Sequence, residues 1–174
     1  MNSSSKSILT FPLIRTFLID GFALAFLLLM PAAAHLTGIP FYFIEPMRIM
    51  LVVALIFTSR SNAYILALAL PVFSFLVSGH PVPVKMLIIM AELVLNVRLF
   101  ISLFHKIRKP FISMFSAIIG SKIFCYLTYW IVFSWAFVVD ESQVIFLIAQ
   151  LIVSLVLSVS VQGISRKRSI SATE

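Results

Sequence analysis

The chain consists of long apolar runs separated by short polar interruptions. A helix that crosses a hydrocarbon core of about 30 Å needs about 20 mainly apolar residues, and we count six such runs, at about 11–34, 41–60, 63–77, 84–104, 111–139 and 144–161. The pattern predicts an all-α polytopic membrane protein. Residues 1–174 would form a single domain, a bundle of six transmembrane helices with a short polar N-terminus at 1–10 and a basic cytoplasmic tail at 162–174.

Three of the six runs have unusual lengths. The continuous apolar part of the second, Ile49–Phe57, is short for a crossing, and so is the third, Ala63–Val77. These two could be tilted crossings or one re-entrant hairpin. We favour two crossings, because the polar turn 60–62 between them would be costly within the bilayer. The fifth run is over-long and should tilt, kink or begin at the interface.

Composition agrees with a membrane location. The chain is 61% apolar and 11% charged, whereas soluble domains are roughly 45–50% apolar and about 25% charged. The net charge of +7 arises from basic residues at the ends of the runs, so it indicates membrane topology and not nucleic-acid binding. With six crossings, nine basic residues lie on the side of the termini and two on the other, Arg48 and Lys85. Because positive loops stay in the cytoplasm, both termini should be cytoplasmic.

Ionisable side chains within apolar runs are costly and usually face a protein interior with a partner. At a rise of about 1.5 Å per residue, Glu92 lies about 12 Å from the outer end of its run, near the level of Lys122. The same estimate places Asp20 near the level of Arg98. Two ion pairs are therefore predicted as possible, Glu92 with Lys122 and Asp20 with Arg98. Glu45 and Arg48 should pair across one helical turn.

Glu92 and Asn96 share a helix face because they are four residues apart. A carboxylate and an amide in the outer half of the bilayer could bind a small polar ligand, although they could equally serve as a link between helices. Aromatic residues follow Lys122 on the fifth run. These aromatic residues are Tyr126, Tyr129 and Trp130. They could form a stacking wall for a flat ligand or an interfacial belt.

The same sequence contains no enzyme signature. His35, His80 and His105 fall on different segments, and no metalloprotease, serine-hydrolase or paired-aspartate motif is present. A single cysteine, Cys125, excludes an intramolecular disulfide framework and a Cys-based zinc site. We therefore expect a protein that is not an enzyme and holds neither metal nor cofactor.

Two further features concern contacts. Gly21 and Ala25 form a small-xxx-small arrangement that lets another helix approach closely, from this chain or another one. The outer loops around Ile39 and His80 are rich in proline, which suits a stiff lid over a pocket or a plain tight connection.

Six short spans, an N-in topology, the small-residue first helix, the Gly38-Ile39-Pro40 loop and the polar fourth helix occur together here. In this combination the chain resembles, over nearly its whole length, the substrate-binding S-components of energy-coupling-factor (ECF) transporters. These six-helix proteins capture a vitamin or related micronutrient from the outside and dock on a transmembrane coupling protein with two ATPases.

The resemblance implies a bacterial inner-membrane protein that binds a small molecule. The chain has no nucleotide-binding motif, so ATP-driven work would belong to the partner subunits. It departs from the family in having Gly21 where alanine is common and in carrying Lys122, which would suit an acidic or zwitterionic ligand. The implied roles are docking for Gly21 and Ala25, gating for Ile39 and His80, and pocket lining for Glu92, Asn96, Lys122 and the fifth-run aromatics.

A different class also fits the outline. Cell-shape membrane scaffolds are similar in size to S-components but transport nothing. A scaffold would have a sealed interior, in which Glu92 and Lys122 need not be reachable from water.

Overall fold

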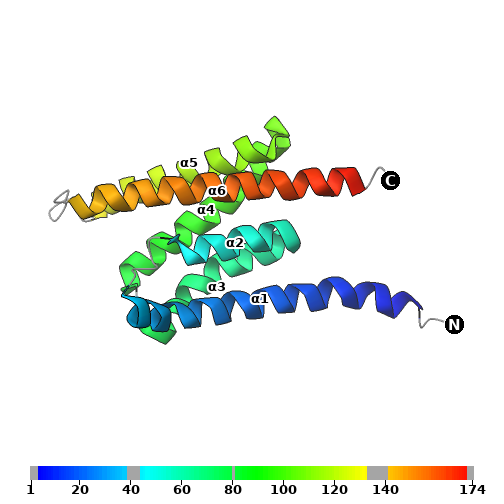
Figure 1. The fold of residues 1–174 in the computed structure, drawn as a ribbon, viewed down its shortest axis with the longest axis horizontal. Helices are drawn as coiled ribbons and strands as arrows, with labels where there is room; N and C mark the ends of the chain where they lie inside the picture. Colours follow the sequence, from blue (N-terminus) through cyan, green and yellow to red (C-terminus); the bar gives the residue numbers. More distant parts are fainter. Residues whose placement is uncertain (1–3, 39–43, 80, 133–140, 172–174) are drawn as a thin grey trace.

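The computed structural model describes residues 4–38, 44–79, 81–132 and 141–171. All regular structure in these ranges is helical, and this confirms the predicted all-α class (Figure 1). The helices are α1 (Ser4–Thr37), α2 (Pro46–Phe57), α3 (Arg60–Ser78), α4 (Pro83–Ile107), α5 (Pro110–Val132) and α6 (Glu141–Ser171).

Five of the six helices are long and apolar enough to cross a membrane, which supports a multi-pass membrane protein. The exception is α2, whose 12 residues extend only about 18 Å at the helical rise. The second helix is therefore shorter than the full crossing that the sequence predicted. Pro46 opens the helix at its first turn and Thr58 caps it, so only the apolar core of that run is helical.

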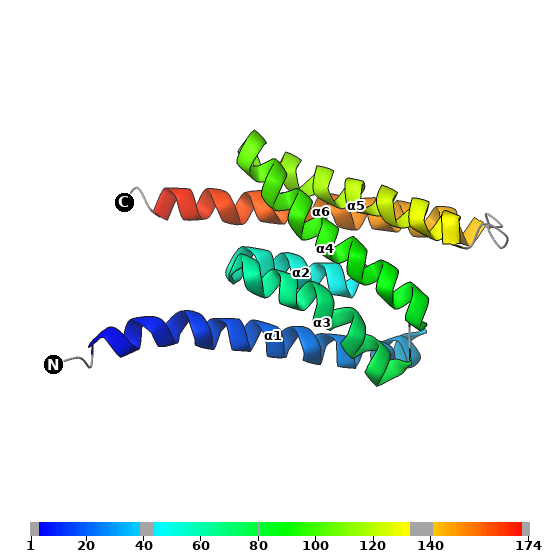
Figure 2. The same cartoon turned by 180° about the vertical axis from the view of Figure 1, so that it is seen from behind.

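The helices alternate in direction, so that the start of α1 and the end of α6 lie at the same end of the molecule (Figure 1). The junctions between α2 and α3 and between α4 and α5 lie at this end too, and α4 crosses the bundle obliquely (Figure 2). The basic residues at the helix ends, among them Arg60 and Lys106, therefore gather at one end. This is the arrangement that the charge bias along the sequence predicts.

The short helix α2 lies at the centre of the bundle, between α1 and α6 (Figure 1). Its side chains take part in three separate apolar clusters. One face packs on α1 and α3, a second on α3 and α4, and a third on α5 and α6, through Met50, Leu51 and Val52 respectively. Since all three residues are buried, α2 packs against both halves of the bundle, which also meet directly where α3 contacts α4.

Helix α5 packs closely against α4 on one side and α6 on the other. A Cβ atom added to Gly120 on α5 would lie 3.2 Å from Cδ1 of Leu99 on α4. On the other side, α5 and α6 bury small residues, among them Ala117 and Ser158. Small side chains at helix contacts allow the close packing that holds helices together in lipid, where apolar burial gives little driving force.

Candidate functional site

Four charged side chains meet inside the bundle: Glu45 at the start of α2, Arg48 in its first turn, Glu92 on α4 and Lys122 on α5. Arg48 Nη2 donates to Glu92 Oε1, and Lys122 Nζ donates to Glu45 Oε1. Arg48 Nε lies 3.2 Å from Glu45 Oε2, and Lys122 Nζ lies 3.6 Å from Glu92 Oε1. The two cations thus alternate with the two carboxylates in a closed network, which we call the charge cluster.

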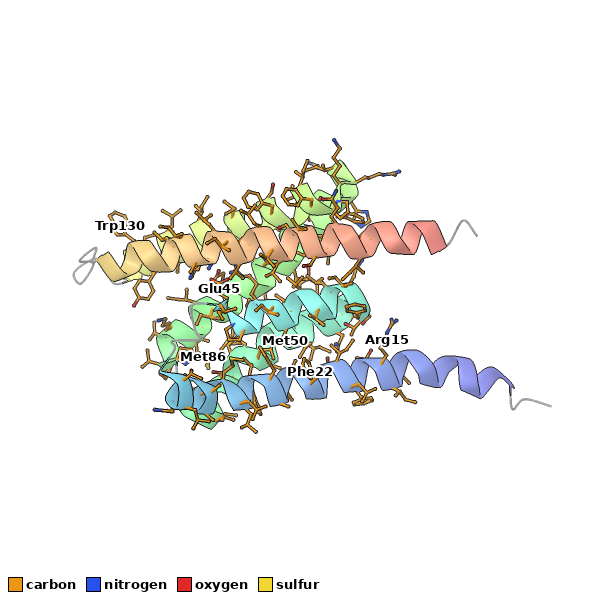
Figure 3. All side chains as sticks on the ribbon, in the orientation of Figure 1. Arg15, Phe22, Glu45, Met50, Met86 and Trp130 are labelled. Carbon is orange, nitrogen blue, oxygen red and sulfur yellow. The ribbon has the colours of Figure 1, made fainter. Side chains whose placement is uncertain are left out.

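The charge cluster confirms two predicted pairs, Glu92 with Lys122 and Glu45 with Arg48. Arg48 and Glu92 are buried, and Lys122 and Glu45 are nearly so. Unpaired charges at this depth would be very unfavourable, whereas two positive and two negative groups compensate one another. Glu45 lies inside the bundle, near the first turn of α2 (Figure 3).

The backbone of Glu45 helps to bring its carboxylate into the charge cluster. Glu45 is the residue before α2 and has φ 52° and ψ 62°, in the left-handed region. A side chain other than glycine is disfavoured there, typically by about 1–2 kcal/mol. Strain of this kind persists only where the surroundings offset it, and the surroundings of Glu45 include ion pairs to Arg48 and Lys122.

Asn96 extends the polar region by one turn along α4. It is fully buried, and its Nδ2 donates to Ser121 Oγ on α5 at 3.3 Å. The Ser121 hydroxyl in turn donates to the carbonyl oxygen of Ile118 at 2.9 Å. As predicted, Glu92 and Asn96 lie on the same face of α4, and both are directed toward the interior.

Four polar atoms in this region have no hydrogen-bond partner among the described residues, but two of them, Glu45 Oε2 and Arg48 Nε, face each other at 3.2 Å in an ion pair. The other two have no partner of either kind in the described part of the chain. They are Arg48 Nη1 and Asn96 Oδ1. Buried polar groups are nearly always satisfied, and an unsatisfied one typically costs about 1–3 kcal/mol. An acceptor for Arg48 and a donor for Asn96 would remove this cost.

The three aromatic residues predicted to line a ligand site lie in different places. The Tyr126 hydroxyl donates to Gln150 Oε1 on α6 at 2.9 Å, and Tyr129 is partly buried. Trp130 is 57% exposed on the outer face of α5 (Figure 3), which contradicts its predicted lining role. At about 100° per residue, Tyr129 points within about 20° of Lys122 but Trp130 about 80° away.

The predicted ion pair between Asp20 and Arg98 is absent among the described residues, and Arg98 is exposed. Asp20 instead accepts a hydrogen bond from Asn62 Nδ2 at 2.7 Å. The reason is topological, because α1 packs against α2 and α3. Asp20 and Arg98 lie at a similar depth, but they belong to α1 and α4, and α1 packs against other helices.

The residues predicted to dock on a partner lie on the first helix, α1. Gly21 and Ala25 lie on an exposed face of α1, and a Cβ atom added to Gly21 would meet no atom within 4 Å. Their small side chains are therefore not used for packing among the described residues. Ile39 and His80, the predicted gating residues, lie outside the described residues.

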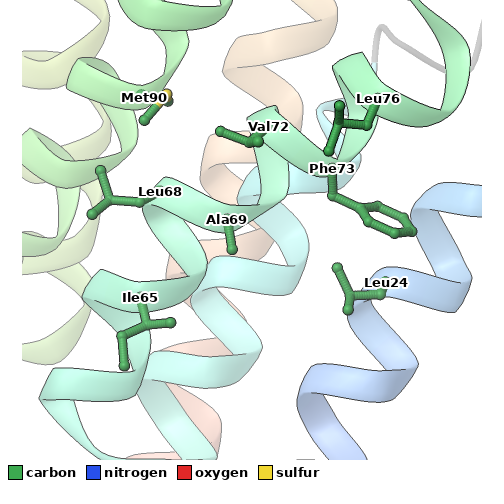
Figure 4. Close-up of a pocket in the computed structure, with 8 residues that line it drawn as sticks. All are labelled: Leu24, Ile65, Leu68, Ala69, Val72, Phe73, Leu76 and Met90. Atoms are coloured by element: carbon green, nitrogen blue, oxygen red, sulfur yellow. The ribbon is translucent and has the colours of Figure 1, made fainter.

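A groove of about 510 Å³ lies between α1, α3 and α4 (Figure 4). Leu24 of α1 faces Phe73 of α3 across one part of it, and Met90 of α4 borders the other. All eight lining residues are apolar. The groove therefore offers no hydrogen bond to a polar ligand, and it is separate in chemistry from the charge cluster.

Sequence reasoning did not include Glu45 and Arg48 in the site, because it assigned both to the outer boundary. One signal could have found them. The apolar part of the second run is too short for a crossing, so its charged start had to lie deeper than the end of a full span.

The described ranges contain no group of three or more His, Cys, Asp or Glu side chains that could hold a metal ion. Comparison with models of protein families, with curated protein sequences and with solved structures gives no significant match.

Proposed function

We propose that this protein is the membrane-embedded capture subunit of an ATP-driven micronutrient transporter of the ECF type. It would bind a small polar or heterocyclic molecule from the outside and carry no catalytic activity of its own. One observation carries the proposal: a buried charge cluster joins three helices, and beside it Arg48 Nη1 and Asn96 Oδ1 find no hydrogen-bond partner in the part of the chain that the structure describes.

Binding would take place at the charge cluster and one turn further along α4. Glu92, Asn96, Lys122 and the partly buried Tyr126 and Tyr129 all lie on inward or half-buried positions. The apolar groove beside α3 does not compete for this role, because a polar ligand would gain no hydrogen bond there.

Transport would require partners. The exposed Gly21 and Ala25 face of α1 would dock on a transmembrane coupling protein, and associated ATPase subunits would supply the energy. The basic end of the bundle would face the cytoplasm of a bacterial cell, with both termini inside. Reporter fusions at each terminus test this orientation, and an external terminus would contradict it.

Native mass spectrometry of the chain in lipid nanodiscs, searching for a co-purified small molecule, tests capture directly. We expect a bound molecule in the wild type and its loss in Glu92→Ala and Asn96→Ala without unfolding. Ser113→Ala is the matched control, because it removes a fully buried hydroxyl that has no partner among the described residues, about two turns away from Ser121 on α5. Full binding in both site variants would reject this site.

A scaffold function is favoured by a different observation. The charge cluster is neutral overall and paired within the chain, so it can hold α2, α4 and α5 together without any ligand. A scaffold would yield no co-purified molecule, and Glu92→Ala would then lower thermal stability with no binding to lose.

A further inference from the structure

The orientation of the Asn96 amide is determined by its neighbours. The Ser121 hydroxyl has one hydrogen and gives it to the carbonyl oxygen of Ile118. Its oxygen can then only accept, so the group that faces it must be the NH₂ of Asn96 and not the carbonyl. The arrangement therefore leaves Asn96 Oδ1 as a buried acceptor that needs a donor from elsewhere.

Arg48 presents the opposite requirement. Its Nη2 is bound to Glu92, and its Nε is close to Glu45. Its Nη1 has no hydrogen-bond partner within the described ranges, although the residue is only 2% exposed. An acceptor at this nitrogen would form a charge-assisted hydrogen bond, which is stronger than one between neutral groups.

One turn of α4 connects the two requirements. Arg48 is bonded to Glu92, and Asn96 follows Glu92 by four residues on the same face of α4, a rise of about 6 Å. A single small ring could therefore address the donor and the acceptor together.

The charge of the surroundings restricts the ligand further. Glu45 and Glu92 already balance Arg48 and Lys122. An added anion or cation would bring an uncompensated charge into a buried region, which is strongly unfavourable. A ligand without net charge avoids this cost.

We infer that the site takes an uncharged heterocycle of the cyclic-amide class. Its ring N–H donates to Asn96 Oδ1, and the adjacent carbonyl accepts from Arg48 Nη1. The inference rests on the proposed capture function and names its ligand class. It replaces the acidic or zwitterionic ligand expected from Lys122 alone, because Glu45 and Glu92 neutralise that lysine.

Four bicyclic probes of similar size test the class on the wild-type chain in nanodiscs, with binding measured by calorimetry and saturation-transfer NMR. They are quinazolin-4-one, its N3-methyl derivative, quinoline-4-carboxylate and the 4-aminoquinolinium cation. From its size, the first should bind with a Kd of about 100 μM. Empty nanodiscs report partition into lipid.

We expect quinazolin-4-one to bind about tenfold or more tightly than its N-methyl derivative, which lacks the donor. In Asn96→Leu, which is close in volume and lacks the acceptor, the two affinities should become equal. Ser113→Ala should retain the wild-type preference.

Equal binding of the two in the wild type, tighter binding of either charged probe, or no binding of quinazolin-4-one at about 1 mM would overturn the inference. Native mass spectrometry separates this failure from failure of the proposed function. Should another molecule co-purify, capture stands and the ligand class is wrong; should none co-purify, both are wrong.

Discussion

Replacing Lys122 by methionine tests whether charge balance holds the bundle together. The substitution keeps most of the length of the side chain but leaves Arg48 as the one cation of the charge cluster beside Glu45 and Glu92. At the 3.6 Å between Lys122 and Glu92, the gross Coulomb attraction is about 4.6 kcal/mol at an effective dielectric constant of about 20.

The net loss is smaller because removing lysine also removes its own desolvation cost. Breaking a buried pair by truncating one partner costs about 3–5 kcal/mol, and the Lys122 side chain keeps 13% exposure, so we expect a value near the lower limit, about 3 kcal/mol. On the scale known for chains of this size, this corresponds to a fall of about 6–12 °C in Tm.

Thermal unfolding in nanodiscs, followed by circular dichroism, measures the effect. Glu45→Gln added to Lys122→Met restores neutrality around the remaining Arg48–Glu92 pair, so the double variant should be more stable than Lys122→Met alone. Lys106→Met, at an exposed position, should change stability by no more than about 0.5 kcal/mol. A double variant as unstable as the sum of both single variants would refute the reasoning from charge balance.

Three further predictions concern other contacts. Asn62→Leu deprives Asp20 of its donor and should destabilise the chain by about 1–3 kcal/mol in the same thermal assay, whereas Arg98→Met should have no effect; equal effects would contradict the assignment. Trp130→Ala removes an exposed side chain and should leave small-molecule binding within about twofold in calorimetry; a loss of binding would place Trp130 at the site. Gly21→Leu adds bulk where space is open and should abolish co-purification with a coupling protein without changing ligand affinity; unimpaired assembly would exclude this face.

Much of the fold could be predicted because apolar runs report directly on the thickness of a bilayer. Five of the six predicted runs coincide with helices long enough to cross a membrane, including the third run, which is short in the sequence. Pro46, Pro83 and Pro110 mark helix starts, as expected from their fixed φ and missing donor. Depth along single helices also gave the Glu92–Lys122 pair, since two residues at one level on adjacent helices can meet.

Lateral position could not be obtained in this way. Depth is one coordinate, and the neighbours of a helix depend on the packing of all six. Asp20 therefore contacts Asn62 on α3 and not Arg98 on α4. Trp130 turned away from Lys122 because the direction of a side chain around the helix axis matters as much as its distance along the chain.

The sequence by itself determined the class of the protein, the end at which its basic residues gather and the need for buried charges to find partners. These follow from local quantities: apolar length, charge position and the cost of ions in lipid. Only the tertiary structure decided that α2 is short and central, and that Glu45 and Arg48 therefore join Glu92 and Lys122 in one neutral cluster. The physical reason is that charge compensation depends on three-dimensional proximity between helices, which no pattern along a single helix specifies.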